Sequence, residues 1–64
     1  MSPKLTVWHQ VEINQGGRIY IASYCVENEI LTVHFSGRRK ATQLGSLPQD
    51  RLAKMLLREL VSGI

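Results

Sequence analysis

The hydrophobic residues of this 64-residue chain change their spacing near residue 46. Before that point they alternate with other residues, as in the segment 31–35, and after it Leu52, Leu56 and Leu60 recur at helical spacing. Alternation places side chains on one face of a β-sheet, whereas helical spacing places them on one stripe of a helix. We therefore predict an α+β fold, an antiparallel meander of three to four strands with one C-terminal helix packed on one face.

Three short segments rich in turn-forming residues divide the first part of the chain. The clearest is Asn14-Gln15-Gly16-Gly17, because glycine adopts a positive φ without steric cost. Glu27-Asn28-Glu29 and Gly37-Arg38-Arg39 are the other two predicted turns. The segments between the turns have strand-like composition and alternation, and we predict strands at Leu5–Ile13, Arg18–Val26 and Ile30–Ser36. Lys40–Leu44 either forms a short fourth strand or stays outside the sheet, because Leu44 falls on the open face by simple parity unless the preceding turn carries a bulge.

The C-terminal segment carries the start and stop signals of a helix over Leu47–Ser62. Ser46 and Gln49 have the spacing of a capping box, in which two side chains satisfy free N–H groups of the first turn. Pro48 is suited to the first turn, and Gly63 is a natural C-terminal cap. The stripe predicted to be buried consists of Leu52, Ala53, Leu56, Leu57, Leu60 and Val61.

The register between the second and third strands decides which side chains the helix covers. Pairing Val26 with Ile30 across a three-residue loop, 27–29, gives one mostly apolar face, and the same parity sets Glu12 near Arg18 as a cross-strand ion pair. The face predicted to contact the helix holds Val7, Val11, Ile13, Ile19, Ile21, Leu31, Val33 and Phe35, with Ser23 and Cys25 beside them. The face predicted to stay open holds Trp8, Tyr20, Tyr24, Val26, Ile30, Thr32 and His34, with Thr6, Gln10, Glu12 and Arg18.

The length of the chain indicates one domain, residues 1–64, with a thin core. A chain of this size buries only about 60% of the surface that it exposes when unfolded, so a homodimer would reinforce it. The single cysteine, Cys25, excludes an internal disulfide and, as a buried thiol, fits a reducing, cytoplasmic setting. We expect no membrane partner, because no signal segment and no run of ~20 apolar residues is present.

The polar residues do not suggest a reaction. His9, His34 and Cys25 are the only soft metal ligands, and they lack the spacing of a metal site. The five carboxylates are scattered over turns and helix rather than paired for acid–base chemistry. We therefore predict a protein that is not an enzyme, with no catalytic residue, no cofactor, no metal and no small-molecule substrate.

The predicted open face is the main indication of function. It is expected to carry aromatic residues, which are enriched in protein interfaces and which also pair across strands without any partner. The favoured interpretation is a small non-catalytic protein-interaction module that binds itself or another protein. Its candidate interaction surface is Trp8, Tyr20, Tyr24, Thr32, His34 and Arg18.

A nucleic-acid-binding domain is the alternative. The net charge is +3, and from Gly37 onward six cations face only two carboxylates. In this alternative Arg38, Arg39 and Lys40, which we call the basic segment, contact phosphates, and the sheet aromatics lie near bases. The architecture is broadly similar to small DNA-binding domains that lay an open sheet in the major groove, although those domains carry several sheet arginines that this chain lacks. The alternative requires the basic segment, the aromatics and Arg18 on one continuous surface.

Overall fold

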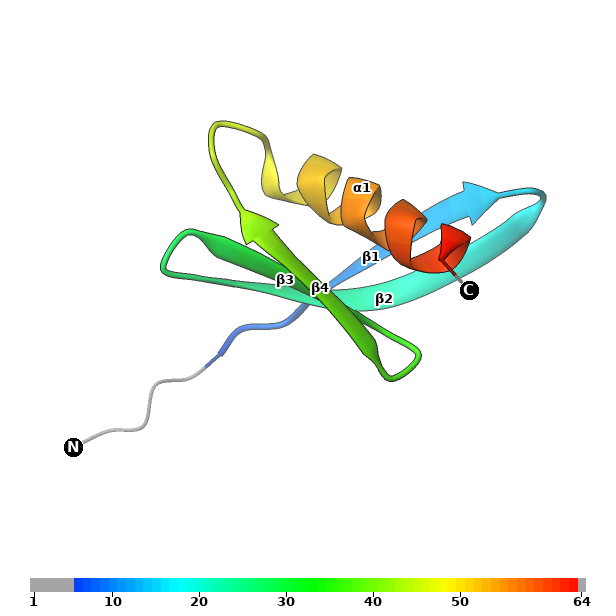
Figure 1. Cartoon of the computed structure of the whole chain (residues 1–64), viewed down its shortest axis with the longest axis horizontal. Helices are drawn as coiled ribbons and strands as arrows, with labels where there is room; N and C mark the ends of the chain where they lie inside the picture. The colour runs from blue at the N-terminus through cyan, green and yellow to red at the C-terminus, as the bar shows by residue number, and fades with distance from the viewer. Residues whose placement is uncertain (1–5, 64) are drawn as a thin grey trace.

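The computed structural model describes residues 6–63 and forms a four-stranded antiparallel sheet with one helix across one face (Figure 1). The strands follow one another across the sheet in chain order, β1-β2-β3-β4, so β1 and β4 form its two edges. The predicted fold class is confirmed, and the fourth strand, which the sequence left open, is present. The elements are β1 (His9–Gln15), β2 (Arg18–Glu27), β3 (Ile30–Phe35), β4 (Arg38–Gln43) and α1 (Gln49–Ser62).

Three two-residue turns connect the strands. Both central residues of each turn have positive φ, as a type I′ hairpin turn requires: 63° and 82° at Gly16-Gly17, 51° and 65° at Asn28-Glu29, and 51° and 77° at Ser36-Gly37. The twist of this turn matches that of the paired strands. Because the loops are so short, they fix the register of every strand pair.

The predicted register between the second and third strands is wrong by one residue. Glu27 rather than Val26 pairs with Ile30, because the loop has two residues instead of three. A shift of one residue sends each side chain of a strand to the opposite face. Tyr20 and Tyr24 therefore lie on the face that contacts the helix, not on the open face. The residues of β2 that do lie on the open face are Ile19, Ile21, Ser23, Cys25 and Glu27.

The predicted register of the first hairpin is also wrong. Its turn is only Gly16-Gly17, so Gln15 pairs with Arg18 and Glu12 pairs with Ile21. The predicted ion pair between Glu12 and Arg18 therefore does not form. The strand also begins at His9 rather than at Leu5, which lies outside the described residues.

The helix begins two residues later than predicted, and its first turn has no side-chain cap. Pro48 is the N-cap residue, and its carbonyl accepts a hydrogen bond of 3.1 Å from the backbone N–H of Leu52. The predicted capping box of Ser46 and Gln49 is absent, because a proline disfavours helical geometry in the residue before it and so keeps Leu47 outside the helix. Gly63 is the C-cap residue, as predicted, and its N–H donates to the Glu59 carbonyl at 3.0 Å.

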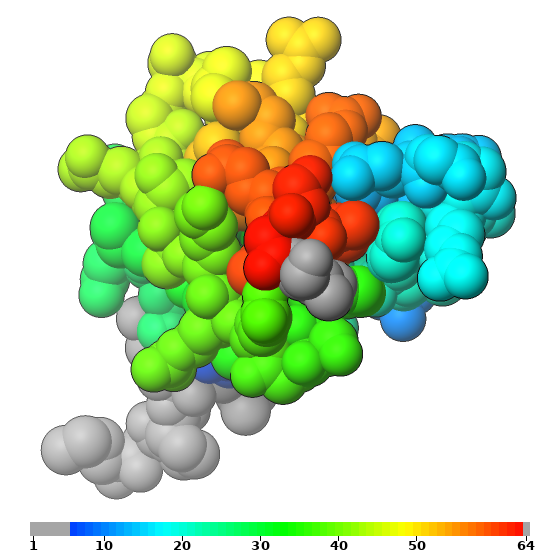
Figure 2. Space-filling view, turned by 45° about the vertical axis from the view of Figure 1, so that its right-hand side comes forward, coloured from blue at the N-terminus to red at the C-terminus, as the bar shows by residue number. Residues whose placement is uncertain are grey.

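The core lies between α1 and the covered face of the sheet. It joins Leu31 and Val33 of β3 to Leu57 of α1, all of which are fully buried. The last turns of the helix are also tied to both edges, through Lys40 to Glu59 and Gln15 to Ser62. Figure 2 shows this end of the helix between β4 and the tip of the β1–β2 hairpin. The buried side chains that complete the core are Val11, Ile13, Ala22, Tyr24, Leu52, Ala53, Leu56 and Leu60.

Candidate interaction face

The face of the sheet opposite α1 carries no other element of the described chain. We call it the open face and define it by the register of the strands. Each strand contributes the residues that alternate with its core residues. The open face consists of Trp8, which precedes β1, with Gln10, Glu12 and Asn14 of β1, Ile19, Ile21, Ser23, Cys25 and Glu27 of β2, Ile30, Thr32 and His34 of β3, and Arg39, Ala41 and Gln43 of β4.

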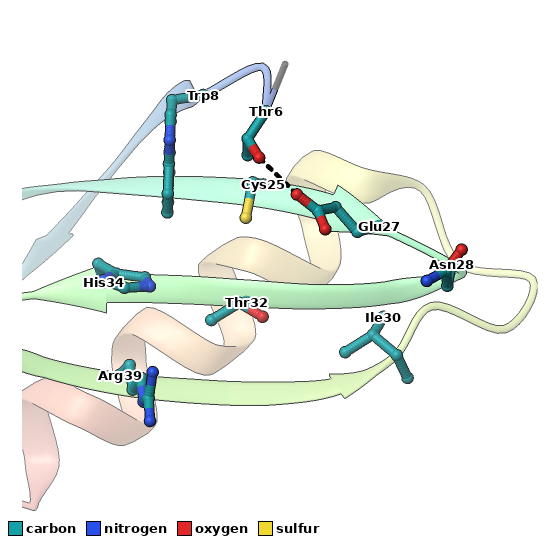
Figure 3. A pocket seen from close by; sticks show the side chains of 9 residues that line it. All are labelled: Thr6, Trp8, Cys25, Glu27, Asn28, Ile30, Thr32, His34 and Arg39. Carbon is teal, nitrogen blue, oxygen red and sulfur yellow. Dashed lines mark hydrogen bonds between the residues drawn. The ribbon is translucent and has the colours of Figure 1, made fainter. Parts of the chain in front are cut away.

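A shallow depression of about 410 Å³ lies at the β2–β3 end of the open face (Figure 3). Trp8 forms one side, and its indole meets the His34 ring edge to face, with centroids 4.9 Å apart and an interplanar angle of 86°. At the other end, the Thr6 hydroxyl donates to the Glu27 carboxylate at 2.5 Å. These two contacts hold the segment 6–8 against the sheet. The lining residues are Thr6, Trp8, Cys25, Glu27, Asn28, Ile30, Thr32, His34 and Arg39.

Cys25 lies at the base of this depression, not beneath the helix as its predicted parity required. It is nevertheless buried, because the segment that carries Thr6 and Trp8 lies beside it (Figure 3). This burial raises the pKa of the thiol, and the nearby Glu27 carboxylate adds to the effect. A thiol with a raised pKa is mostly protonated at neutral pH, so Cys25 is a weak nucleophile and a small apolar contact.

Large apolar side chains of the open face are exposed along its length. Ile19 is 64% exposed, Ile21 56%, Trp8 48% and Ile30 40%. Ile19 and Ile21 lie in the half of β2 nearest the Gly16-Gly17 turn, whereas Trp8 and Ile30 flank the depression. These side chains leave apolar surface uncovered in both halves of the open face.

The charges of the open face are few and nearly balanced. Glu12 and Glu27 carry negative charge, and Arg39 is its one cation among the described strands. Because side chains alternate along a strand, Arg38 and Lys40 lie on the helix-bearing face and Arg39 lies on the open face. Lys40 pairs with Glu59 of the helix at 2.6 Å, and Arg38 donates to the Gly63 carbonyl at 3.2 Å.

The structure therefore unites half of the candidate surface taken from the sequence. Trp8, Thr32 and His34 share the depression, whereas the two tyrosines pack in or against the core. Arg18 pairs with Gln15 and follows the parity of the helix-bearing face. The candidate interaction surface predicted from the sequence omitted Ile19 and Ile21, and it assigned Arg39 to the nucleic-acid alternative instead. Asn28 was the available signal, because asparagine favours the first position of a type I′ turn and so argues for the shorter loop.

Neither a metal centre nor a membrane span emerges from the described residues. Within residues 6–63, no three His, Cys, Asp or Glu side chains are grouped so that they could hold a metal ion. The helix α1, the one helix in this part of the chain, is too short and too polar to cross a membrane.

The chain matches no protein-family model, and searches of curated proteins and of solved structures also returned no match.

Proposed function

We propose that this chain is a small non-catalytic protein-interaction module that binds its partner with the open face. The observation that carries the proposal is the exposure of Trp8, Ile19, Ile21 and Ile30 on one face of the sheet, with few charges among them. Aromatic and aliphatic side chains that are freed from water supply most of the binding energy of protein interfaces. Such a surface fits a partner that presents apolar side chains.

The depression at Trp8 is the best candidate for the centre of the interface. It combines an aromatic wall with the Ile30 side chain, and Arg39 and Glu27 lie at its margin as polar groups that could fix the orientation of a ligand. It is an open depression rather than an enclosed pocket, so it suits a side chain of a protein partner better than a whole substrate, most of whose surface would have to be buried. We propose that a large apolar side chain of the partner occupies it.

The charge distribution argues for a protein partner over a nucleic acid. The alternative required the basic segment and the aromatics on one surface, but Arg38, Lys40 and Arg18 follow the parity of the helix-bearing face. One cation, Arg39, accompanies Trp8. A phosphate backbone needs several cations along its path, because neutralising phosphates supplies most of the affinity.

Trp8 is the single tryptophan of the chain, so its fluorescence reports directly on the depression. Peptides selected from a random library against the wild-type protein should contain an aromatic or large aliphatic anchor and should shift the Trp8 emission on binding. Ile30→Ser should weaken binding about tenfold or more, as expected for a residue of an interface centre. Met55→Ser is the matched control, because Met55 is 42% exposed on the helix and lies outside the open face.

Selected peptides that bind Ile30→Ser and wild type equally would contradict the proposal. A second titration uses single-stranded and duplex oligonucleotides at ~50 and ~200 mM salt. Binding to nucleic acid that falls steeply with salt and is lost in Arg39→Ala would replace the proposed function with the nucleic-acid alternative. No oligonucleotide binding at either salt concentration is the expected result.

A further inference from the structure

The two edges of the sheet differ in their protection against pairing with another strand. Edge strands are usually blunted by cations, prolines or bulges. The strand β4 carries Arg38, Arg39 and Lys40 in succession. The strand β1 has seven residues, contains neither proline nor lysine nor arginine, and pairs one to one with β2 over its whole length, so it has no bulge. Its only carboxylate is Glu12. The edge formed by β1 therefore lacks the usual protective features.

The backbone of β1 also presents a regular row of free hydrogen-bonding groups. The type I′ turn joins the carbonyl of Gln15 to the N–H of Arg18. By the alternation of an antiparallel ladder, Val11 and Ile13 also direct their backbone groups toward β2, whereas Gln10 and Glu12 direct theirs away from the sheet. Among residues 6–63, no hydrogen bond reaches these outward backbone groups.

We propose that a second copy of this chain pairs with β1 along this edge, antiparallel and centred on Val11. The two sheets then form one continuous sheet of eight strands around a two-fold axis. In this register Gln10 of each copy faces Glu12 of the other, so an amide donor meets a carboxylate twice. A register centred on Glu12 would instead place two carboxylates directly opposite each other, which is unfavourable. Pairing through β4 would gather the three cations of each copy along one junction.

The proposed dimer leaves the open face free. In an antiparallel pair directly opposed residues share a face, so both open faces lie on one side of the joined sheet and both helices on the other. The depressions at Trp8 and the exposed Ile21 side chains of the two copies would then form one extended surface. The edge proposal stands independently of the proposed function, because it uses backbone groups rather than the depression.

A charge reversal at one position tests both the dimer and its register. Gln10→Glu places two like-charged pairs across the junction, whereas Gln10→Lys places two opposite-charged pairs there, and neither substitution alters the core because Gln10 is exposed. Sedimentation equilibrium of the full chain up to ~1 mM should show a dimer whose dissociation constant is about tenfold higher for Gln10→Glu than for Gln10→Lys. Gln43→Glu on the opposite edge should associate like wild type.

Hydrogen exchange identifies the junction directly. The amides of Gln10 and Glu12 should become more protected as the protein concentration rises, whereas those of Arg39 and Ala41 at the β4 edge should not. Ile30→Ser, an open-face variant on β3, which β2 separates from β1, should dimerise normally. A wild-type protein that stays monomeric at ~1 mM, or equal association of Gln10→Glu and Gln10→Lys, would overturn the proposal. Self-association that is lost in Ile30→Ser but unaffected by Gln10→Glu would place it on the open face, overturning the edge dimer while supporting the proposed function.

Discussion

The two faces of the sheet are built from the same strands by simple alternation, yet they differ sharply in burial. On the covered face, Leu31 and Val33 are fully buried against Leu57 of the helix. On the open face, Ile19 and Ile21 of β2 are more than half exposed. Residues of similar hydrophobicity are therefore buried on one face and left exposed to solvent on the other. Position in the sheet, rather than residue type, decides which of them pack in the core and which are left for the proposed interface.

The largest expected effect is on the covered face. Leu57→Ala removes a fully buried side chain and should lower the free energy of unfolding by about 2–5 kcal/mol. A loss of this size approaches the whole stability of a small domain. Chemical denaturation monitored by circular dichroism measures it. A midpoint close to that of wild type would mean that the helix does not pack on the sheet through Leu57.

An intermediate effect is expected at the turn that sets the two faces. Glu29 has a φ of 65°, where a side chain is strained and glycine is not. Glu29→Gly should therefore raise the free energy of unfolding by roughly 0.5–1 kcal/mol. Gln43→Gly is the control, because Gln43 is exposed in a strand where glycine should destabilise by a similar amount. Destabilisation by both substitutions would argue against the two-residue loop and for the longer one.

The smallest expected effect is on the open face. Ile21→Thr should change the free energy of unfolding by no more than about 0.5 kcal/mol, because threonine is also β-branched and suits a strand, and the isoleucine side chain is 56% exposed and makes no core contact. The same denaturation experiment applies, and Ala22→Ser, one residue away but buried, is the matched control that should destabilise. Comparable losses from the two variants would mean that the register of β2 is misplaced. This outcome would restore the face assignment expected from sequence.

The elements of the fold were accessible from local signals. Alternation over 31–35 and the helical spacing of Leu52, Leu56 and Leu60 identified the strands and the helix without any tertiary information. The observed boundaries of these elements differ from the predicted ones by a few residues, at places where one local preference overrode another. At the start of the helix, the effect of Pro48 on the preceding residue displaced the capping role expected of Ser46.

The candidate site was harder to predict from the sequence, because its residues depend on the register of the strands. Trp8, Thr32 and His34 were correctly assigned to the open face, since they do not lie on the strand whose register shifted. Tyr20 and Tyr24 were misassigned, and Ile19 and Ile21 were taken for core residues. Both sets of β2 side chains are apolar enough to fill a core, so hydrophobicity alone did not distinguish them.

The sequence by itself determined that this chain forms an antiparallel sheet followed by one helix, because hydrophobic period and turn residues act over a few positions. Only the tertiary structure decided which face of β2 meets the helix. That choice depends on whether the loop between β2 and β3 contains two residues or three. A difference of one residue moves every side chain of the strand to the opposite face of the sheet. The two-residue turn at Asn28-Glu29 places the tyrosines against the core and leaves Ile19 and Ile21 exposed to solvent.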